Sequence, residues 1–189
     1  ISIFSAESPL KILAWNFVKT VGMFWVWGDG NWRHNFANAP QLHWAVGVFF
    51  LAGLLASFRA KERFNSLFLW LWLLLSMLPV IVSAEGIPHA LRAIILIPPV
   101  MILSGWGAYF ILERLPNWIR RPSFVLVVVL ITLSTFNRYF VDWAQNPNVY
   151  YAFATPYVEL ADALDTLPRD LPKYVVVNAS GVEVRGFPM

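Results

Sequence analysis

A short polar segment between two apolar stretches holds the first residues that could do chemistry, Glu85, His89 and Arg92. Pro88 favours the first turn of a helix, and a helix starting there would place His89 and Arg92 on one face at its N-terminus. Backbone N–H groups at a helix N-terminus attract anions, and a guanidinium matches phosphate oxygens bidentately. We therefore predict a lipid-phosphate site at Glu85, His89 and Arg92. The alternative is an interfacial arginine that pairs with Glu85 or with bulk phospholipid.

A second polar group lies earlier in the chain, within the sequence GDGNWRHN. Several hydrogen-bonding side chains around a tryptophan suit sugar hydroxyls and the apolar face of a sugar ring. The residues we expect at the rim of a cavity that contacts a sugar or an acceptor are Asp29, Asn31, Trp32, Arg33 and His34. Asp29 and His34 could also ligate a metal, but their spacing matches no recognised ligand set, so a divalent metal is unsupported and we predict no metal site. The alternative for this loop is structural, with Asp and Asn side chains capping their own turns.

The elements that position these two groups are apolar. Four stretches contain no acidic or basic residue: 43–58, 64–84, 93–112 and 123–137. Each approaches the ~20 residues that a helix needs to cross ~30 Å of hydrocarbon, and each is followed by a polar break. The sequence therefore predicts four transmembrane helices.

Basic residues in the short breaks predict the orientation. One break contains Arg59, Lys61 and Arg63, and another contains Arg114 and a pair of arginines at 120 and 121. Short loops rich in Lys and Arg remain in the cytoplasm. Both polar groups, the N-terminal loop and the C-terminal segment are therefore expected on the opposite side, which is lumenal in a eukaryote and external in a bacterium or archaeon. We expect the outer face of a plasma (inner) membrane.

Composition agrees with a membrane protein and excludes other classes. Hydrophobic residues make up 58% of the chain, charged residues 13%, and mean hydropathy is +0.58. The net charge of +3 comes from the two basic breaks and forms no stripe on one surface, so nucleic acid is excluded as a partner. The absence of cysteine excludes disulfides, a thiol nucleophile and zinc binding through sulfur.

The regions that flank the apolar stretches complete the predicted architecture. Residues 10–27 are apolar but carry Lys11, Asn16, Lys19 and Thr20 on one side, which predicts an amphipathic helix in the membrane interface with its polar side toward water. A fifth span is the alternative. After the last apolar stretch we predict a helix over 155–167 and two strands, 173–178 and 182–185.

We therefore predict an all-α polytopic membrane protein with a small extracytoplasmic α/β segment at its C-terminus. Its parts are an interfacial helix and loop at 1–41, a transmembrane domain at 42–138 and the α/β segment at 139–189. Both ends of the chain read as cut, so we expect a fragment of a longer membrane protein.

The motifs GDGNWRHN and EGIPHALRA, with the apolar stretches between and after them, resemble the C-terminal half of prokaryotic GT-C glycosyltransferases. These are the protein-mannosyltransferase-like and lipid-A-aminoarabinose-transferase-like enzymes. The resemblance implies transfer of a sugar from a polyprenyl-phosphate carrier to a protein, lipid or glycan acceptor on the outer face. It implies that Glu85, His89 and Arg92 face the carrier phosphate and that the earlier loop shapes the cavity rim. The catalytic carboxylate of that superfamily lies in a first outer loop, which does not occur before Leu10, so no residue is assigned as catalytic.

Two other classes of function are open at this stage. A non-catalytic membrane subunit or lipid-binding module on the same scaffold would need no catalytic loop. A transporter would need ionisable groups near the middle of the membrane, and the four stretches offer none.

Overall fold

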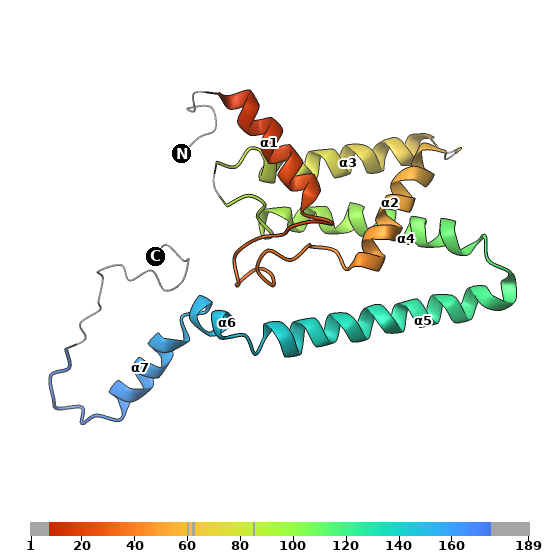
Figure 1. Cartoon of the computed structure of the whole chain (residues 1–189). Helices are drawn as coiled ribbons and strands as arrows, with labels where there is room; N and C mark the ends of the chain where they lie inside the picture. The colour runs from red at the N-terminus through yellow and green to blue at the C-terminus, as the bar shows by residue number, and fades with distance from the viewer. Residues whose placement is uncertain (1–7, 60, 62, 85, 175–189) are drawn as a thin grey trace.

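The computed structural model describes residues 8–59, 61, 63–84 and 86–174, and every regular element among them is helical (Figure 1). In chain order the elements are α1 (Pro9–Gly22), α2 (Trp44–Phe58), α3 (Arg63–Ile81), a 3₁₀ turn η2 (Arg92–Leu96) that runs into α4 (Ile97–Leu112), α5 (Asn117–Phe136) with its π-helical continuation η3 (Asn137–Trp143), α6 (Pro147–Ala152) and α7 (Thr155–Asp165).

Three helices are long and apolar enough to cross a membrane: Arg63–Ile81, Arg92–Leu112 and Asn117–Trp143. They cover three of the four predicted stretches, so the prediction of a membrane protein is supported. The fourth stretch forms α2, which has only 15 residues. At 1.5 Å per residue it reaches roughly 22 Å, less than the ~30 Å of a hydrocarbon core. The described residues thus provide three candidate spans and one shorter apolar helix.

The tightest helix packing is between α2 and α4, which cross in Figure 1. Gly53 of α2 and Gly107 of α4 make the approach possible, because a Cβ on Gly53 would overlap the carbonyl of Leu103 and a Cβ on Gly107 would overlap that of Phe49. Small residues allow membrane helices to bring their backbones together in this way. Leu103 at this crossing and Phe50 one turn away are almost completely buried. The crossing of α2 and α4 is therefore the centre of the core.

Helix α1 packs on α3 with its polar side inward, so the prediction that this side faces water is wrong for two residues. Asn16 and Thr20 are buried. The Asn16 amide donates to the backbone carbonyls of Ile81 (2.9 Å) and Ser83 (3.0 Å), just where α3 ends. The last carbonyls of a helix have no partner within the helix, and a buried end needs donors from elsewhere. Asn16 supplies them, and α1 leaves apolar side chains such as Trp15 exposed.

The C-terminal part of the chain is less packed. None of the residues of α5, η3 or α7 is buried. Helix α7 confirms the helix predicted to begin at Thr155, but no strand occurs in the part of the chain that the structure describes. Lys173, where the first strand was predicted to begin, instead donates to the Leu164 carbonyl (2.6 Å). Tyr174 is not in a strand either, and residues 175–178 and all of the second strand lie outside the described residues.

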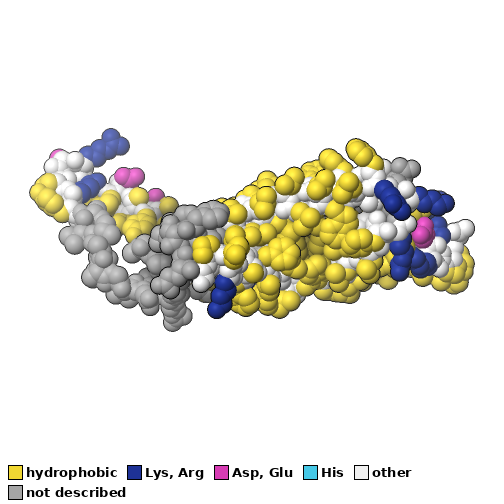
Figure 2. All heavy atoms as spheres, turned by 90° about the horizontal axis from the view of Figure 1, so that it is seen from above, with side chains coloured by type: hydrophobic (Ala, Val, Ile, Leu, Met, Phe, Trp, Pro, Cys, Tyr) yellow, Lys and Arg dark blue, Asp and Glu magenta, His cyan; other side chains and the backbone are white. Residues whose placement is uncertain are grey.

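Basic side chains mark one end of the helical region. The α2–α3 and α4–α5 connections lie at the same end (Figure 1), and Lys and Arg side chains gather there around an acidic one, beside a largely hydrophobic central surface (Figure 2). The loop that joins α1 to α2 and the segment that leads into η2 lie at the opposite end. The fold therefore places the two predicted polar groups near each other.

Candidate functional site

Three side chains from the two polar groups meet at this end of the molecule: Asp29, His34 and His89. The Asp29 Oδ2 atom lies 2.8 Å from His34 Nδ1. The ring centroids of His34 and His89 are 5.0 Å apart, with 32° between the ring planes. One donor atom from each of the three residues lies within 4.8 Å of the others. Residues more than fifty positions apart in the sequence thus form one cluster.

The carboxylate of Asp29 is held by both loops. Its Oδ1 atom accepts from the backbone N–H of Asn31 (2.8 Å), and its Oδ2 atom accepts from the backbone N–H of Ala90 (2.9 Å). Asp29 is only 6% exposed. A buried carboxylate without donors would be costly, and here two N–H groups fix its orientation.

This arrangement corrects one premise of the predicted phosphate site, the helix expected to begin at Pro88. Regular helical structure begins at Arg92, not at Pro88, so His89 and Arg92 do not share a helix face. His89 turns toward His34, while Arg92 donates to the Ser83 hydroxyl. The backbone N–H of Ala90 in this turn donates to the Asp29 carboxylate. An anionic side chain of the protein therefore already occupies this N–H group. Glu85 lies outside the described residues.

A closed loop positions Asp29 and His34. The Gly28 N–H donates to the Asn38 carbonyl (3.2 Å) and the Asn38 N–H donates to the Asp29 carbonyl (2.8 Å). A side chain on Gly28 would overlap the carbonyl of Ala39 where the two arms of the loop meet. Asn38 has a φ of 64°, a left-handed conformation that Asn tolerates better than most residues. Glycine at 28 and asparagine at 38 thus follow from the shape of the loop.

Three of the residues predicted at the cavity rim have structural contacts. The Asn31 side chain accepts from the Arg33 backbone N–H (3.0 Å), which is the turn-capping alternative. The Arg33 side chain donates to the Ala152 carbonyl in α6. Trp32 packs on Phe36, and its carbonyl accepts from the indole N–H of Trp143 (3.0 Å). Asn31, Trp32 and Arg33 therefore shape the loop and tie it to the C-terminal helices.

Burial and charge set the protonation of His89. Burial lowers the pKa of His89, the Arg92 guanidinium lowers it further, and the Asp29 carboxylate opposes both. His89 is thus neutral at pH 7, with a lone pair on one ring nitrogen. Its Nδ1 atom is buried and finds no hydrogen-bond partner in the part of the chain that the structure describes.

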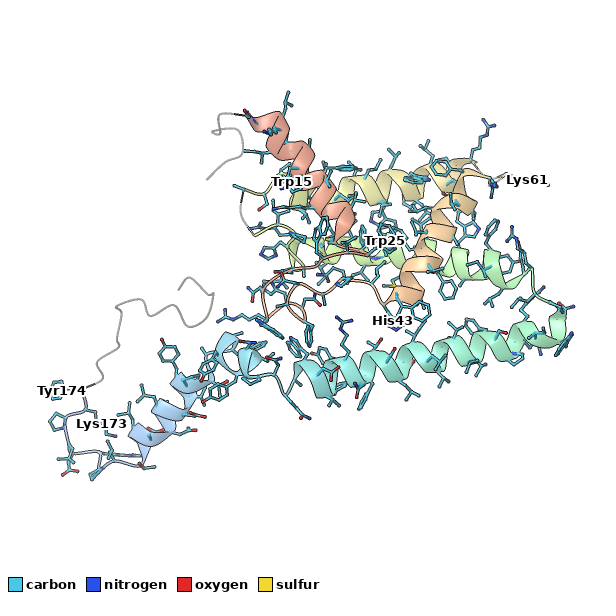
Figure 3. All side chains as sticks on the ribbon, viewed as in Figure 1. Trp15, Trp25, His43, Lys61, Lys173 and Tyr174 are labelled. Carbon is cyan, nitrogen blue, oxygen red and sulfur yellow. The ribbon has the colours of Figure 1, made fainter. Side chains whose placement is uncertain are left out.

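Two pockets lie beside the cluster. One has a volume of about 700 Å³ and is lined by Asp29, Asn31, Asn38, Lys19, the rings of Trp15 and Trp27, and the 86–88 segment. The other has a volume of about 270 Å³ and is lined by His34, Arg33, His43, Arg138, Tyr139 and neighbouring residues. Figure 3 shows Trp15 on α1 and His43 at the start of α2, where its Nε2 atom lies 2.9 Å from the Ser134 hydroxyl of α5.

Sequence reasoning missed Lys19 and Arg138 as pocket residues. Lys19 was assigned to the water-facing side of an interfacial helix, and Arg138 follows the last predicted span. The available signal was that each cation stands close to an apolar stretch, at the end where the polar loops were expected. Only the packing of the loops against α1 and η3 turns that proximity into pockets.

No family model, curated protein or solved structure matches the chain, so its own residues carry the functional argument. The cluster offers a carboxylate, two imidazoles and nearby cations at one end of an apolar helical region. Such groups can bind a phosphate or a sugar, move a proton or hold a metal.

Proposed function

We propose that this chain is part of an integral-membrane glycosyltransferase that takes a sugar from a polyprenyl-phosphate carrier. The larger pocket is the observation that carries the proposal. It combines the Lys19 ammonium, the Asp29 carboxylate and the rings of Trp15 and Trp27 at one end of three candidate spans. A donor of this class has a phosphate, a sugar and a long apolar tail, and each needs a different surface.

The pocket and its surroundings offer these three surfaces. Lys19 provides a positive charge for the phosphate, and Arg92 is a second cation in the neighbouring segment. Tryptophan rings and the amides of Asn31 and Asn38 suit the apolar face and the hydroxyls of a sugar. Exposed apolar side chains on the helices provide a surface for the polyprenyl tail. The resemblance of the sequence motifs to GT-C enzymes supports the same class.

The proposal is tested by carrier binding. The protein is placed in lipid nanodiscs and titrated with undecaprenyl phosphate, using Lys19→Ala and Arg92→Ala variants. A charge-assisted contact is worth ~1.5–3 kcal/mol, so each variant should weaken affinity by about 10- to 150-fold. The matched control is Lys61→Ala, which removes a lysine from the opposite end of the helices (Figure 3).

Equal affinity of wild type, Lys19→Ala and Lys61→Ala would contradict the proposed phosphate site. Carrier binding without transfer of a sugar from any polyprenyl-phosphate sugar, measured on the longest protein that contains this chain, would favour the alternative of a non-catalytic lipid-binding subunit. Transfer that Lys19→Ala reduces would support the enzyme.

The proposal also places the cluster on the outer face of the plasma membrane. Cysteines introduced at Lys61 and Gly86, at opposite ends of the molecule, should react differently with an impermeant thiol reagent in intact cells. The expected result is labelling at 86 and protection at 61. Labelling at 61 with protection at 86 would reverse the orientation and move the pocket to the cytoplasm.

A further inference from the structure

We infer that Asp29, His34 and His89 form a binding site for one divalent transition-metal ion, with zinc as the best match. The fold brings together two imidazoles and one carboxylate whose donor atoms lie within 4.8 Å of one another. The sequence offered only two of these donors, five residues apart and in no recognised pattern. The third comes from a segment sixty residues later in the chain. This inference does not rest on the proposed function.

Hydrogen bonds already orient the Asp29 carboxylate for metal binding. Metal-binding side chains are usually oriented by hydrogen bonds from groups around the site. Asp29 has two such bonds, from the backbone N–H groups of Asn31 and Ala90. They leave lone pairs on both carboxylate oxygens, and they fix the carboxylate between the two loops. An ion bound here joins the loops at the point where Asp29 already joins them.

His34 contributes the second donor. Without a metal, its Nδ1–H group donates a proton to a hydrogen bond with Asp29 Oδ2, which lies 2.8 Å away. Two ligands of a single zinc ion, each about 2.0–2.2 Å from the metal, are separated by little more than this distance. Metal binding displaces that proton to solvent, and both atoms then bind the ion through the lone pairs that the proton had used.

His89 supplies the independent observation. Its Nδ1 atom is buried and has no hydrogen-bond partner among the described residues, although buried polar atoms nearly always have one. The ring of His89 stands 5.0 Å from the ring of His34, centroid to centroid. One ring nitrogen of His89 also lies within 4.8 Å of the donor atoms of Asp29 and His34, so an ion bound by those two residues is within reach of this ring.

Two imidazoles and one carboxylate favour some metal ions over others. Imidazole nitrogen favours zinc, cobalt, copper, nickel and iron over magnesium and calcium, which prefer oxygen ligands. Three protein ligands also leave a fourth tetrahedral position open, the arrangement found where zinc binds water or a substrate. We therefore assign the site to a zinc-like ion with one open position.

The test is a metal titration of the whole protein in detergent after removal of metals with a chelator. Co²⁺ in a tetrahedral site absorbs in the visible region, so the bound ion reports its own geometry. Wild type should bind one Co²⁺ per chain and release it when Zn²⁺ is added, and Mg²⁺ should not compete. His89→Gln and Asp29→Asn should each lose about 100-fold or more in affinity, since loss of supporting residues alone costs 10–100-fold.

His43→Gln is the matched control, because His43 is the remaining histidine and lies at the same end of the molecule outside the cluster. It should bind Co²⁺ as tightly as wild type. Melting temperatures measured without metal identify any variant that fails to fold. If Asp29→Asn fails to fold, the result for His89→Gln alone tests the site. Equal Co²⁺ binding by His89→Gln and wild type, or no visible absorption in wild type, would overturn the site. Neither result depends on carrier binding, so failure of the metal site and failure of the proposed function are distinguishable.

Discussion

Two candidate spans of equal hydropathy differ in how much of each is buried against the rest of the protein. The spans that contain α4 and α5 both have a mean hydropathy of 1.9, yet 33% of the first is buried and none of the second. Helix α4 has glycine at 107, where the backbone of α2 approaches, and Leu103 one turn earlier with no exposed surface. Helix α5 has bulky valines and leucines on every side. Lipid is as apolar as leucine, so hydrophobicity places a helix in the membrane, and close backbone approach decides which helices pack.

Breaking the α2–α4 approach should have the largest effect. In Gly107→Ala the new methyl group would overlap the carbonyl of Phe49, so the two helices must separate. We expect a loss of about 3 kcal/mol or more, at or above the upper end for overpacked cores. Unfolding by SDS titration measures it.

Gly105→Ala is the matched control, two residues away on the same helix. A Cβ at Gly105 meets nothing within 4 Å, and alanine favours a helix over glycine. Its stability should equal or slightly exceed that of wild type. Equal losses in the two variants would mean that the close approach of α2 to Gly107 is not responsible for the loss.

The next comparison removes the same side chain from each helix. Leu103→Ala on α4 leaves a cavity at a site with no exposed surface and should cost about 2–5 kcal/mol. Leu130→Ala on α5, where leucine is 55% exposed, should cost within about 0.5 kcal/mol. Thermal unfolding in the same detergent measures both. A large loss in Leu130→Ala would show that α5 is packed against something in the intact protein.

The sequence predicted where helices form well, but it predicted poorly which residues contact each other in the fold. Absence of charge and helical length identified three spans, and Thr155-Pro156 identified the start of α7, because these signals are local. The side of α1 that faces inward could not be read, since Asn16 is buried only because α3 ends beside it. A polar side chain is expected to be exposed, but Asn16 is buried because the carbonyls at the end of α3 need hydrogen-bond donors.

The same limit applies to the site. Both polar groups were recognised from residue type, and both lie at one end of the molecule. Their internal arrangement was not predictable, since Asp29 takes the N–H of Ala90 that a helix N-terminus would offer to a phosphate. The residues around Ala90 do not reveal that the Asp29 carboxylate from another loop accepts a hydrogen bond from this segment. His89 was therefore predicted with Arg92 and is found with His34.

The smallest expected effect concerns the link between the packed helices and α5. The His43 Nδ1 atom accepts from the Ala45 N–H at the start of α2 (3.3 Å), so Nε2 carries the hydrogen and donates to the Ser134 hydroxyl of α5 (2.9 Å). Burial lowers the pKa of His43 from 6.5, and the Arg138 guanidinium lowers it further. Below pH 6.5 the unfolded chain binds a proton that the folded protein resists, so stability should fall as pH falls and level off below the folded pKa.

His43→Asn tests this link because asparagine caps a helix without titrating in this range. Between about pH 7.5 and about pH 5.5 the melting temperature of wild type should fall further than that of His43→Asn, while the two proteins differ less at the higher pH. All other residues are the same in both proteins, so the contributions of other titrating groups cancel in the difference. Parallel melting curves across this range would show that His43 is protonated as easily in the folded protein as in the unfolded chain. The bond from the Ala45 N–H to His43 Nδ1, which only the neutral ring can accept, would then give the neutral form no advantage in the folded protein.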